Sequence, residues 1–262
     1  MIRITAFTDE ISPYLDQAFR IGMEQGIEHF QFRTVYGRRF PLLEADDFTM
    51  LLRLHTKLSI HFDAVSLAAW RTGTDQTPWD QLKQIGYPSI FKTMLKMDCK
   101  ICTVFAAPCF SRDTERLLNI ENLRRFTAAA SKKGISVRLV NSPATFCNTP
   151  EQMLSILRAV GQGNLSLCWD ANSMRLGDYQ DIAKAYQELA PYITDIRLTD
   201  TVELPDGNNK FVPLGEGSFR TRELITLLRN SSYDGRLTLD LHCLNEEESF
   251  KKSIQVLNDL LS

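Results

Sequence analysis

The chain has 262 residues and a formal net charge of -2 at pH 7, with 44% hydrophobic and 24% charged residues. This length can bury a substantial core, and the composition is ordinary for a globular protein. The small net charge offers no electrostatic attraction for nucleic acid or an acidic membrane surface, and no apolar run approaches the roughly 20 residues that span a bilayer. We therefore expect neither nucleic acid nor a membrane as a partner.

The start of the chain and its cysteines indicate the compartment. Residues 1–5 read directly as a strand, without the apolar core of a signal peptide, so we expect a cytoplasmic location. The 6 cysteines fall mostly in apolar, strand-like segments. Cys99 and Cys102 have redox or zinc spacing, but neither a second pair nor a nearby histidine accompanies them. We expect reduced, structural thiols.

One unit recurs along the chain: a short β-branched or aromatic run, a polar loop and an amphipathic helix. A helix is predicted after each strand, with a break near Gly86 and Pro88 in the helix that starts at about Trp79. Apolar alternation and flanking turn residues predict eight strands, at Arg3–Thr8, Ile27–Arg33, Lys57–Asp63, Lys100–Ala106, Gly134–Asn141, Asn164–Asp170, Ile193–Asp200 and Arg236–His242.

Eight strand–helix units without a linker predict one domain over residues 1–262, an α/β protein with a closed (β/α)8 TIM barrel. The alternative, a doubly wound open sheet, would be expected to carry a Gly-x-Gly-x-x-Gly turn after an early strand, and the chain has none. In a TIM barrel the active site lies at the carboxyl ends of the strands, so the polar residues at those ends are the candidates for function.

The predicted seventh strand holds the most informative polar residues. Asp195 and Arg197 alternate onto one face of this strand. A buried guanidinium is costly unless carboxylates surround it, and the neighbouring strands can supply Asp170 and Asp240. His242 lies on the same face of its strand as Asp240, two residues nearer the carboxyl end of the barrel, which we call its mouth. It is a candidate general acid or base.

Four motifs resemble those of a known family. They are Phe-Thr-Asp-Glu-Ile at 7–11, Cys-Trp-Asp-Ala-Asn at 168–172, Val-Pro-Leu-Gly-Glu-Gly at 212–217 and Leu-Thr-Leu-Asp-Leu-His at 237–242. In this order and spacing they resemble the xylose-isomerase-like TIM barrel superfamily, in its sugar phosphate isomerase/epimerase branch, over essentially the whole chain. The resemblance implies an enzyme that moves a proton beside a sugar carbonyl.

The resemblance also implies a divalent metal held by Glu, Asp, His and Glu at the ends of strands five to eight, with the two glutamates as the acid/base pair. At these positions this chain has Val140, Asp170, Arg197 and Asp240. Valine has no ligand atom and arginine has no free lone pair, so two carboxylates remain. We expect no metal cofactor; if Mn, Mg or Zn binds, Asp170 and Asp240 are its expected ligands.

The guanidinium of Arg197 is the expected substitute for the metal ion. The net charge of the site is unchanged, because the chain loses one carboxylate and replaces a divalent cation by a monovalent one. We expect Arg197 to donate charge-assisted hydrogen bonds to both Asp170 and Asp240. Arg138 is in phase with Val140 one layer lower in the barrel, and it is expected to add a second positive charge.

Two sets of site residues are predicted from the strand ends and the motifs. The catalytic candidates are Asp240, His242 and Asp170. A structural role stays open for each candidate, since strand-end histidines and arginines also serve as partners for neighbouring groups. The substrate-binding candidates are Arg197, Arg138, Asn141, Asn172, Glu216, His61 and Arg33.

The main functional hypothesis is a sugar isomerase/epimerase-like barrel with a degenerate metal site, which transfers a proton next to a sugar carbonyl. The alternative is a non-catalytic barrel that binds a carbohydrate or a small anion. An apurinic endonuclease of the same fold ranks last, because it needs a histidine-rich metal cluster and the chain has 4 scattered histidines. The expected partner is a small sugar or sugar derivative, and the sequence is compatible with a homo-oligomer.

Overall fold

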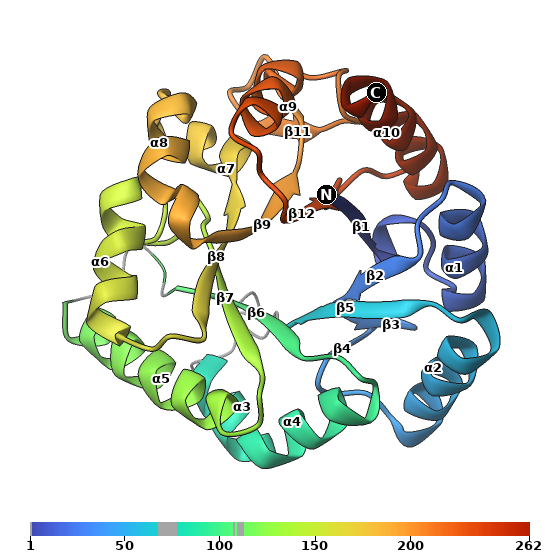
Figure 1. Cartoon of the computed structure of the whole chain (residues 1–262), viewed down its shortest axis with the longest axis vertical. Coiled ribbons are helices and arrows are strands. Elements are labelled where there is room, and N and C mark those ends of the chain that lie inside the picture. The colour runs from blue at the N-terminus through green and yellow to red at the C-terminus, as the bar shows by residue number, and fades with distance from the viewer. Residues whose placement is uncertain (1, 68–77, 107, 109–112) are drawn as a thin grey trace.

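A computed structural model describes residues 2–67, 78–106, 108 and 113–262 of the chain. Parallel strands close into a barrel, and helices surround it (Figure 1). The barrel strands are β1 (Arg3–Phe7), β2 (His29–Phe32), β5 (His61–Ser66), β6 (Ile101–Phe105), β7 (Ser136–Val140), β8 (Leu165–Asp170), β9 (Ile193–Leu198) and β12 (Arg236–Leu239). They lie in the order β1-β12-β9-β8-β7-β6-β5-β2, and β1 pairs with both β12 and β2. The predicted TIM barrel is confirmed.

The helices alternate with these strands along the chain. The helical break predicted near Gly86 and Pro88 is confirmed, since Gly86 separates two helices and has a φ of 84°. Within the described residues, no helix combines the length and the apolar character needed to cross a membrane. The α-helices are α1 (Leu15–Glu24), α2 (Ala45–Leu58), α3 (Pro78–Ile85), α4 (Tyr87–Lys96), α5 (Asp113–Ser131), α6 (Pro150–Val160), α7 (Ala171–Leu176), α8 (Ile182–Leu189), α9 (Thr221–Asn230) and α10 (Glu246–Leu261).

Smaller elements extend the strand ends. A 3-10 helix, η1 (Thr8–Glu10), follows β1, and another, η3 (Ala190–Tyr192), precedes β9. Two antiparallel hairpins lie outside the barrel sheet. They are formed by β3 (Thr34–Val35) with β4 (Arg38–Arg39), and by β10 (Thr201–Glu203) with β11 (Asn209–Phe211).

Helix α6 shows how local sequence sets the boundaries of an element. The Thr149 hydroxyl accepts a hydrogen bond from the Gln152 backbone N–H, and the Gln152 side chain accepts one from the Thr149 backbone N–H. This reciprocal cap satisfies donors that have no partner within the helix, and Pro150 fits the first helical position. Gly161 ends the helix with a φ of 63°, a conformation that glycine adopts without strain.

The third barrel strand starts later in the chain than predicted. Helix α2 continues to Leu58 and ends where Ser59 takes a left-handed φ of 52°. Strand β5 therefore begins at His61 and ends at Ser66. As a result, His61 lies at the amino end of its strand, at the opposite end of the barrel from the mouth, and its predicted position at a carboxyl strand end is wrong.

A layer of hydrogen-bonded polar side chains crosses the middle of the barrel. Arg138 on β7 donates from Nη1 to Asp195 Oδ2 on β9 at 2.9 Å, with only 2% of Arg138 exposed. The Asp195 carboxylate also accepts from Thr238 Oγ1 at 2.6 Å and from Gln31 Nε2 at 2.9 Å. This carboxylate thus joins β7, β9, β12 and β2, and Thr5 adds β1 as a fifth strand because its hydroxyl bonds to that of Thr238.

The free thiols of the described residues lie mostly in the interior, as expected for structural cysteines. Burial raises the pKa of Cys99 to about 12, so this thiol stays protonated at neutral pH. The sixth cysteine, Cys109, lies outside the described residues. The described free cysteines are Cys99, Cys102, Cys147, Cys168 and Cys243.

Substituting Arg138 by Met is expected to lower the free energy of unfolding by about 3–5 kcal/mol, because Asp195 would become a buried carboxylate without its counter-ion. Chemical denaturation measures this loss. The double variant Arg138→Met/Asp195→Asn is the control, since it removes the uncompensated charge and keeps an acceptor oxygen. We expect it to recover part of the loss, and equal stability of the two variants would contradict the assignment.

Candidate functional site

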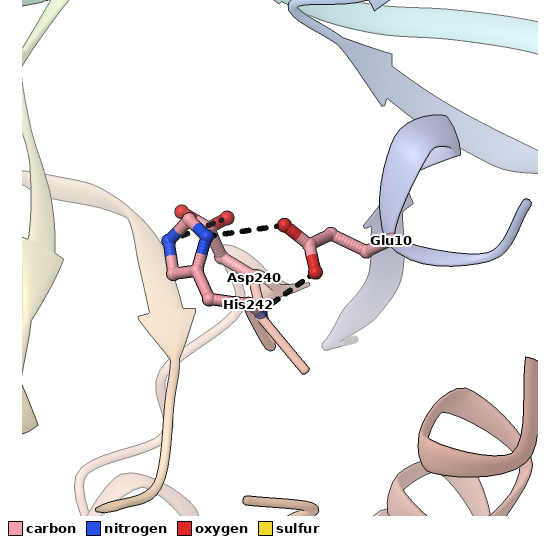
Figure 2. Close-up of side chains that lie close together, drawn as sticks. All are labelled: Glu10, Asp240 and His242. Atoms are coloured by element: carbon pink, nitrogen blue, oxygen red, sulfur yellow. Dashed lines mark hydrogen bonds and ion pairs between the residues drawn. The ribbon is translucent and has the colours of Figure 1, made fainter. Parts of the chain in front are cut away.

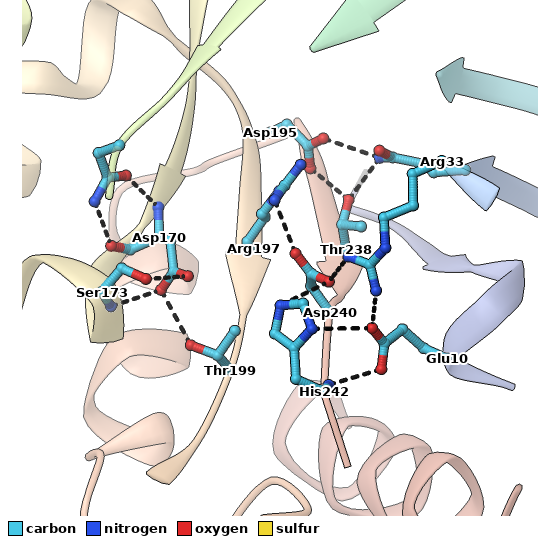
Figure 3. Close-up of polar contacts among 12 residues, drawn as sticks. Glu10, Arg33, Asp170, Ser173, Asp195, Arg197, Thr199, Thr238, Asp240 and His242 are labelled. Atoms are coloured by element: carbon cyan, nitrogen blue, oxygen red, sulfur yellow. Dashed lines mark hydrogen bonds and ion pairs between the residues drawn. The ribbon is translucent and has the colours of Figure 1, made fainter. Parts of the chain in front are cut away.

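The candidate site lies at the carboxyl ends of the barrel strands, where several elements bring charged side chains together (Figure 3). Arg33 follows β2, and Arg197 is in β9. Asp240 and His242 follow β12, and Glu10 closes η1 after β1. These strands are neighbours in the barrel, so residues far apart in the sequence meet at one point.

Asp240 is shared by two guanidinium groups. Its Oδ1 accepts a hydrogen bond from Arg33 Nη1 at 2.6 Å, and its Oδ2 accepts one from Arg197 Nη1 at 2.8 Å. Only 1% of Asp240 is exposed. Burial on its own raises the pKa of this carboxyl, but His242, Arg33 and Arg197 outweigh burial and hold the pKa well below its usual range. Asp240 is therefore ionised at neutral pH.

Arg33 connects Asp240 to the start of the chain. Its Nε donates to Asp9 Oδ2 at 2.9 Å, and its Nη2 donates to Glu10 Oε1. The three nitrogens of this guanidinium thus face three carboxylates, and its carbon lies 4.7 Å from the ring centre of Phe7. Arg33 acts as a fixed counter-ion of this side of the mouth.

His242 is held between two carboxylates (Figure 2). Its Nδ1 lies 3.3 Å from Glu10 Oε1, and its Nε2 lies 3.3 Å from Asp240 Oδ1. Its backbone N–H donates to Glu10 Oε2 at 2.7 Å, and its φ of 55° is uncommon for a residue with a side chain. Burial lowers the pKa of the imidazole, but Asp240 and Glu10 outweigh burial and raise the pKa above its usual value.

Asp170 lies across Arg197 from these groups and is bonded in a different way. It caps α7, and its carboxylate accepts from the Ser173 backbone N–H at 2.9 Å and from Ser173 Oγ at 2.7 Å. Thr199 Oγ1 donates to it at 3.1 Å. The Asn141 side chain bonds to both backbone groups of Asp170. Burial raises the pKa of Asp170 above its usual value, and the bonds from Ser173 offset only part of this rise.

The predicted ion pair of Arg197 with Asp240 is present, but the predicted hydrogen bonds to Asp170 are absent. Among the described residues, Nε and Nη2 of Arg197 are buried and have no hydrogen-bond partner. The carboxylate of Asp170 is instead bonded to Ser173 and Thr199. The guanidinium carbon of Arg197 instead lies over two aromatic rings, 5.1 Å from the centre of Phe7 and 5.5 Å from that of Phe105.

The residues at the four metal-ligand positions implied by the resemblance do not fit a divalent cation. The side chain of Val140 offers no donor atom, and Arg197 brings a positive charge. Both oxygens of Asp240 already accept from guanidinium groups. Asp170 would be left as the one carboxylate of the four positions that is not bonded to a guanidinium, and it already accepts from Ser173 and Thr199.

A second group of ligand atoms lies nearby. One atom each of Glu10, Asp240 and His242 lie within 4.8 Å of one another. However, Arg33 donates to both carboxylates of this group and offsets part of their negative charge. A metal ion bound there would have to compete with that guanidinium.

The other predicted substrate-binding residues lie behind the mouth or away from it. Arg138 is paired with Asp195 one layer below. Asn172 is buried and donates to Thr199 Oγ1 at 3.1 Å, which supports Thr199 behind Asp170. Asn141 holds the backbone of Asp170. These three residues shape the barrel interior.

The predicted pocket positions of Glu216 and His61 are wrong. Glu216 is exposed and lies 3.4 Å from Lys252 Nζ. Its loop is instead fixed by Asp200, whose carboxylate accepts from the backbone N–H groups of Gly215 and Gly217. His61 stacks on His29 at the far end of the barrel, with ring centres 4.7 Å apart.

Two residues of the mouth were absent from the predicted site. Phe7 and Phe105 are both the last residues of their strands and lie under the guanidinium of Arg197. Their signal was available, since strand-end position and alternating phase place both side chains in the barrel. Glu10 was also absent from the predicted site and is a partner of Arg33 and His242.

Comparison with known proteins places this geometry in context. A solved structure of the probable 3-DHS dehydratase AsbF from Bacillus anthracis is 17% identical with a TM-score of 0.79, covering 98% of this chain and 99% of that one. The IOLI protein, solved with a zinc atom, is 16% identical with a TM-score of 0.79, covering 100% and 98% of the two chains. D-allulose 3-epimerase from Methylomonas sp., solved with D-allulose, is 12% identical with a TM-score of 0.77, covering 98% and 96%.

At such low identity these structures support the fold alone. No curated protein matches the sequence. The model of one family, described as xylose isomerase-like TIM barrel, matches residues 89–260, which is more than half of the chain. The match spans the strands that carry Asp170, Arg197 and Asp240. The chain therefore belongs to the xylose isomerase-like TIM barrel family.

Proposed function

We propose that this barrel transfers a proton next to the carbonyl group of a small sugar or sugar derivative, without a divalent metal. The observation that carries the proposal is the environment of His242, whose ring nitrogens lie 3.3 Å from Glu10 Oε1 and Asp240 Oδ1. The side chain is 28% exposed, so it can reach a ligand in the mouth. An oriented imidazole with a pKa above its usual value is suited to act as a general acid near neutral pH.

His242 and Asp170 can divide the proton transfer between them. The imidazolium of His242 would donate a proton to the carbonyl oxygen, and the carboxylate of Asp170 would take the proton from the neighbouring carbon. The raised pKa of Asp170 makes it a stronger base than an exposed aspartate. Figure 3 draws Asp170 in one group with Ser173 and Thr199, and His242 in a separate group with Asp240 and Glu10.

Arg197 would supply the positive charge that a metal supplies in a metal-dependent member of this fold. A fixed cation at the point where negative charge develops lowers the barrier, and its effect is largest in a site that excludes water. Arg197 is 6% exposed and is held by Asp240, so it needs little reorganisation during the reaction.

A second candidate function is binding without turnover. The two buried N–H groups of Arg197 that have no partner among the described residues favour it, because unpaired buried donors attract an acceptor from a ligand. A barrel that holds a carbohydrate or a small anion would need these donors and would not need His242 as an acid.

Purified protein incubated with excess manganese and then desalted is expected to contain far less than one metal ion per chain by mass spectrometry. The expectation follows from Arg33 and Arg197, which already neutralise Asp240. A stoichiometric ion that disappears in Glu10→Gln would instead place a metal at Glu10, Asp240 and His242. Such a result would overturn the metal-free proposal.

Proton transfer predicts incorporation of solvent deuterium into the carbon next to a carbonyl. The protein, incubated in deuterium oxide with a panel of ketoses, aldoses and sugar acids, should label at least one of them, as followed by proton NMR. His242→Gln and Asp170→Asn should each slow labelling by about 10²–10⁴-fold, the range for loss of an acid–base group.

The matched control for labelling is Arg220→Lys, because Arg220 is exposed and pairs with Glu223 outside the mouth. This variant should label at the wild-type rate. If no member of the panel is labelled, or if all three variants behave alike, catalysis by this pair is excluded and binding becomes the better hypothesis.

The raised pKa of His242 also predicts a pH dependence of stability. Because Glu10 and Asp240 favour the imidazolium in the folded state, this stabilisation is complete below the unfolded pKa of about 6.5. It is lost as the pH rises through the higher folded pKa of His242. Between about pH 6 and about pH 9, urea denaturation should show a steeper loss of stability for wild type than for His242→Gln. Parallel curves would mean that the two carboxylates do not act on this histidine.

A further inference from the structure

The hydrogen-bond donors of Arg197 indicate which chemical group of a ligand would bind there. Its Nη1 is bonded to Asp240 at 2.8 Å, whereas Nε and Nη2 are buried and without a partner among the described residues. Nε–H and the adjacent Nη2–H point in the same direction and form the two-pronged edge of a guanidinium. One complete edge is therefore free, and the other is bound.

Leaving such an edge unpaired is costly, since each buried donor without an acceptor forfeits the hydrogen bonds that water would give it. Only 6% of Arg197 is exposed. The thiol of Cys168 lies beside the guanidinium and interacts with it as a weak sulfur acceptor, but burial raises the pKa of this thiol well above its usual range. Cys168 thus stays neutral and supplies no charge to the free edge.

The surroundings of the edge select its partner. Phe7 and Phe105 come from strands on different sides of the barrel, and both rings lie within 5.5 Å of the guanidinium carbon. Aromatic rings cannot accept two parallel N–H bonds, so these contacts hold the guanidinium without pairing its edge. A partner must offer two oxygens side by side, as a carboxylate does.

The charges around the mouth favour a monoanion over a dianion. Asp9, Glu10 and Asp240 lie beside Arg33, Arg197 and His242, and Asp170 is a further carboxyl group, so the mouth has no surplus positive charge. A phosphate ester would add two negative charges near neutral pH, and a carboxylate adds one. Because no surplus cation is present, each negative charge brought into this poorly hydrated site is costly, and a dianion costs more than a monoanion.

We infer that the ligand of this mouth is a sugar acid, and that its carboxylate binds side-on to Nε and Nη2 of Arg197. This inference rests on the proposed function, because it assigns the substrate class for the same site. It places the carboxylate at the centre of the barrel and leaves His242 and Asp170 to act on a carbonyl further along the molecule. Arg197 is then a substrate-binding residue in addition to a fixed cation.

Isothermal titration calorimetry with D-gluconate and D-glucuronate, compared with D-glucitol, D-glucose and D-glucose 6-phosphate, tests the inference. At least one of the two sugar acids should bind more tightly than the neutral compounds and the phosphate ester. Arg197→Lys keeps a positive charge beside Asp240 but lacks the two-pronged edge, so it should weaken this binding by about 10- to 100-fold. Arg220→Lys, outside the mouth, should bind as wild type.

A second measurement needs no variant and covers the case in which Arg197→Lys fails to fold. In wild-type protein labelled with nitrogen-15, the Arg197 Nε–H resonance should move downfield on addition of the sugar acid and stay unchanged with D-glucitol. Equal binding of neutral and acidic sugars, or binding of the phosphate ester in place of both acids, would overturn the carboxylate assignment.

The binding and labelling experiments can distinguish failure of the ligand class from failure of the proposed catalysis. Binding of a sugar acid that depends on Arg197, without deuterium incorporation, would support the ligand class and reject catalysis. Deuterium incorporation into a neutral ketose that is unaffected by Arg197→Lys would support catalysis and overturn the ligand class.

Discussion

The shared carboxylate of Asp240 is the constraint on which the mouth of this barrel depends. One oxygen accepts from Arg33 and the other from Arg197, at 2.6 and 2.8 Å. Arg33 follows β2 and Arg197 lies on β9, the strands on either side of the pair β1 and β12. Removing either arginine would leave the buried carboxylate of Asp240 with one counter-ion fewer. The same carboxylate lies 3.3 Å from His242 Nε2 and raises the pKa of that imidazole. Charge balance, packing and acid–base character are thus set by one group.

The barrel uses a buried arginine–carboxylate pair twice, with different consequences. In the lower layer, Asp195 accepts from Arg138 and from neutral side chains around it, and this network joins strands across the barrel. In the upper layer, Arg197 keeps two donors without a partner among the described residues. A fully paired network gives rigidity, and a partly paired one gives the capacity to bind. The two layers therefore differ in how completely their arginine donors are paired.

The sequence predicted the barrel because eight strands, each followed by a helix, leave few other architectures. It predicted the Arg197–Asp240 pair because both residues are inward-facing on adjacent strands. It could not predict that the carboxylate of Asp170 would cap α7 and bond to Ser173, three residues later, in place of Arg197. Nor could it place His61, since that depended on where α2 ends at Leu58. Both differences depend on local features, a helix cap at Asp170 and a helix end at Leu58, that the pattern of strand residues does not reveal.

A guanidinium in place of a metal ion changes what the site can recognise. A metal presents a point charge to which oxygens can bind from any open direction, whereas a guanidinium presents a plane with separate donor edges. Here one edge is fixed by Asp240, and two aromatic rings lie against the group. The remaining edge accepts ligand atoms in one orientation only. With Val140 and Arg197 at two of the positions where the resemblance implies metal ligands, the cation at this point of the barrel is directional.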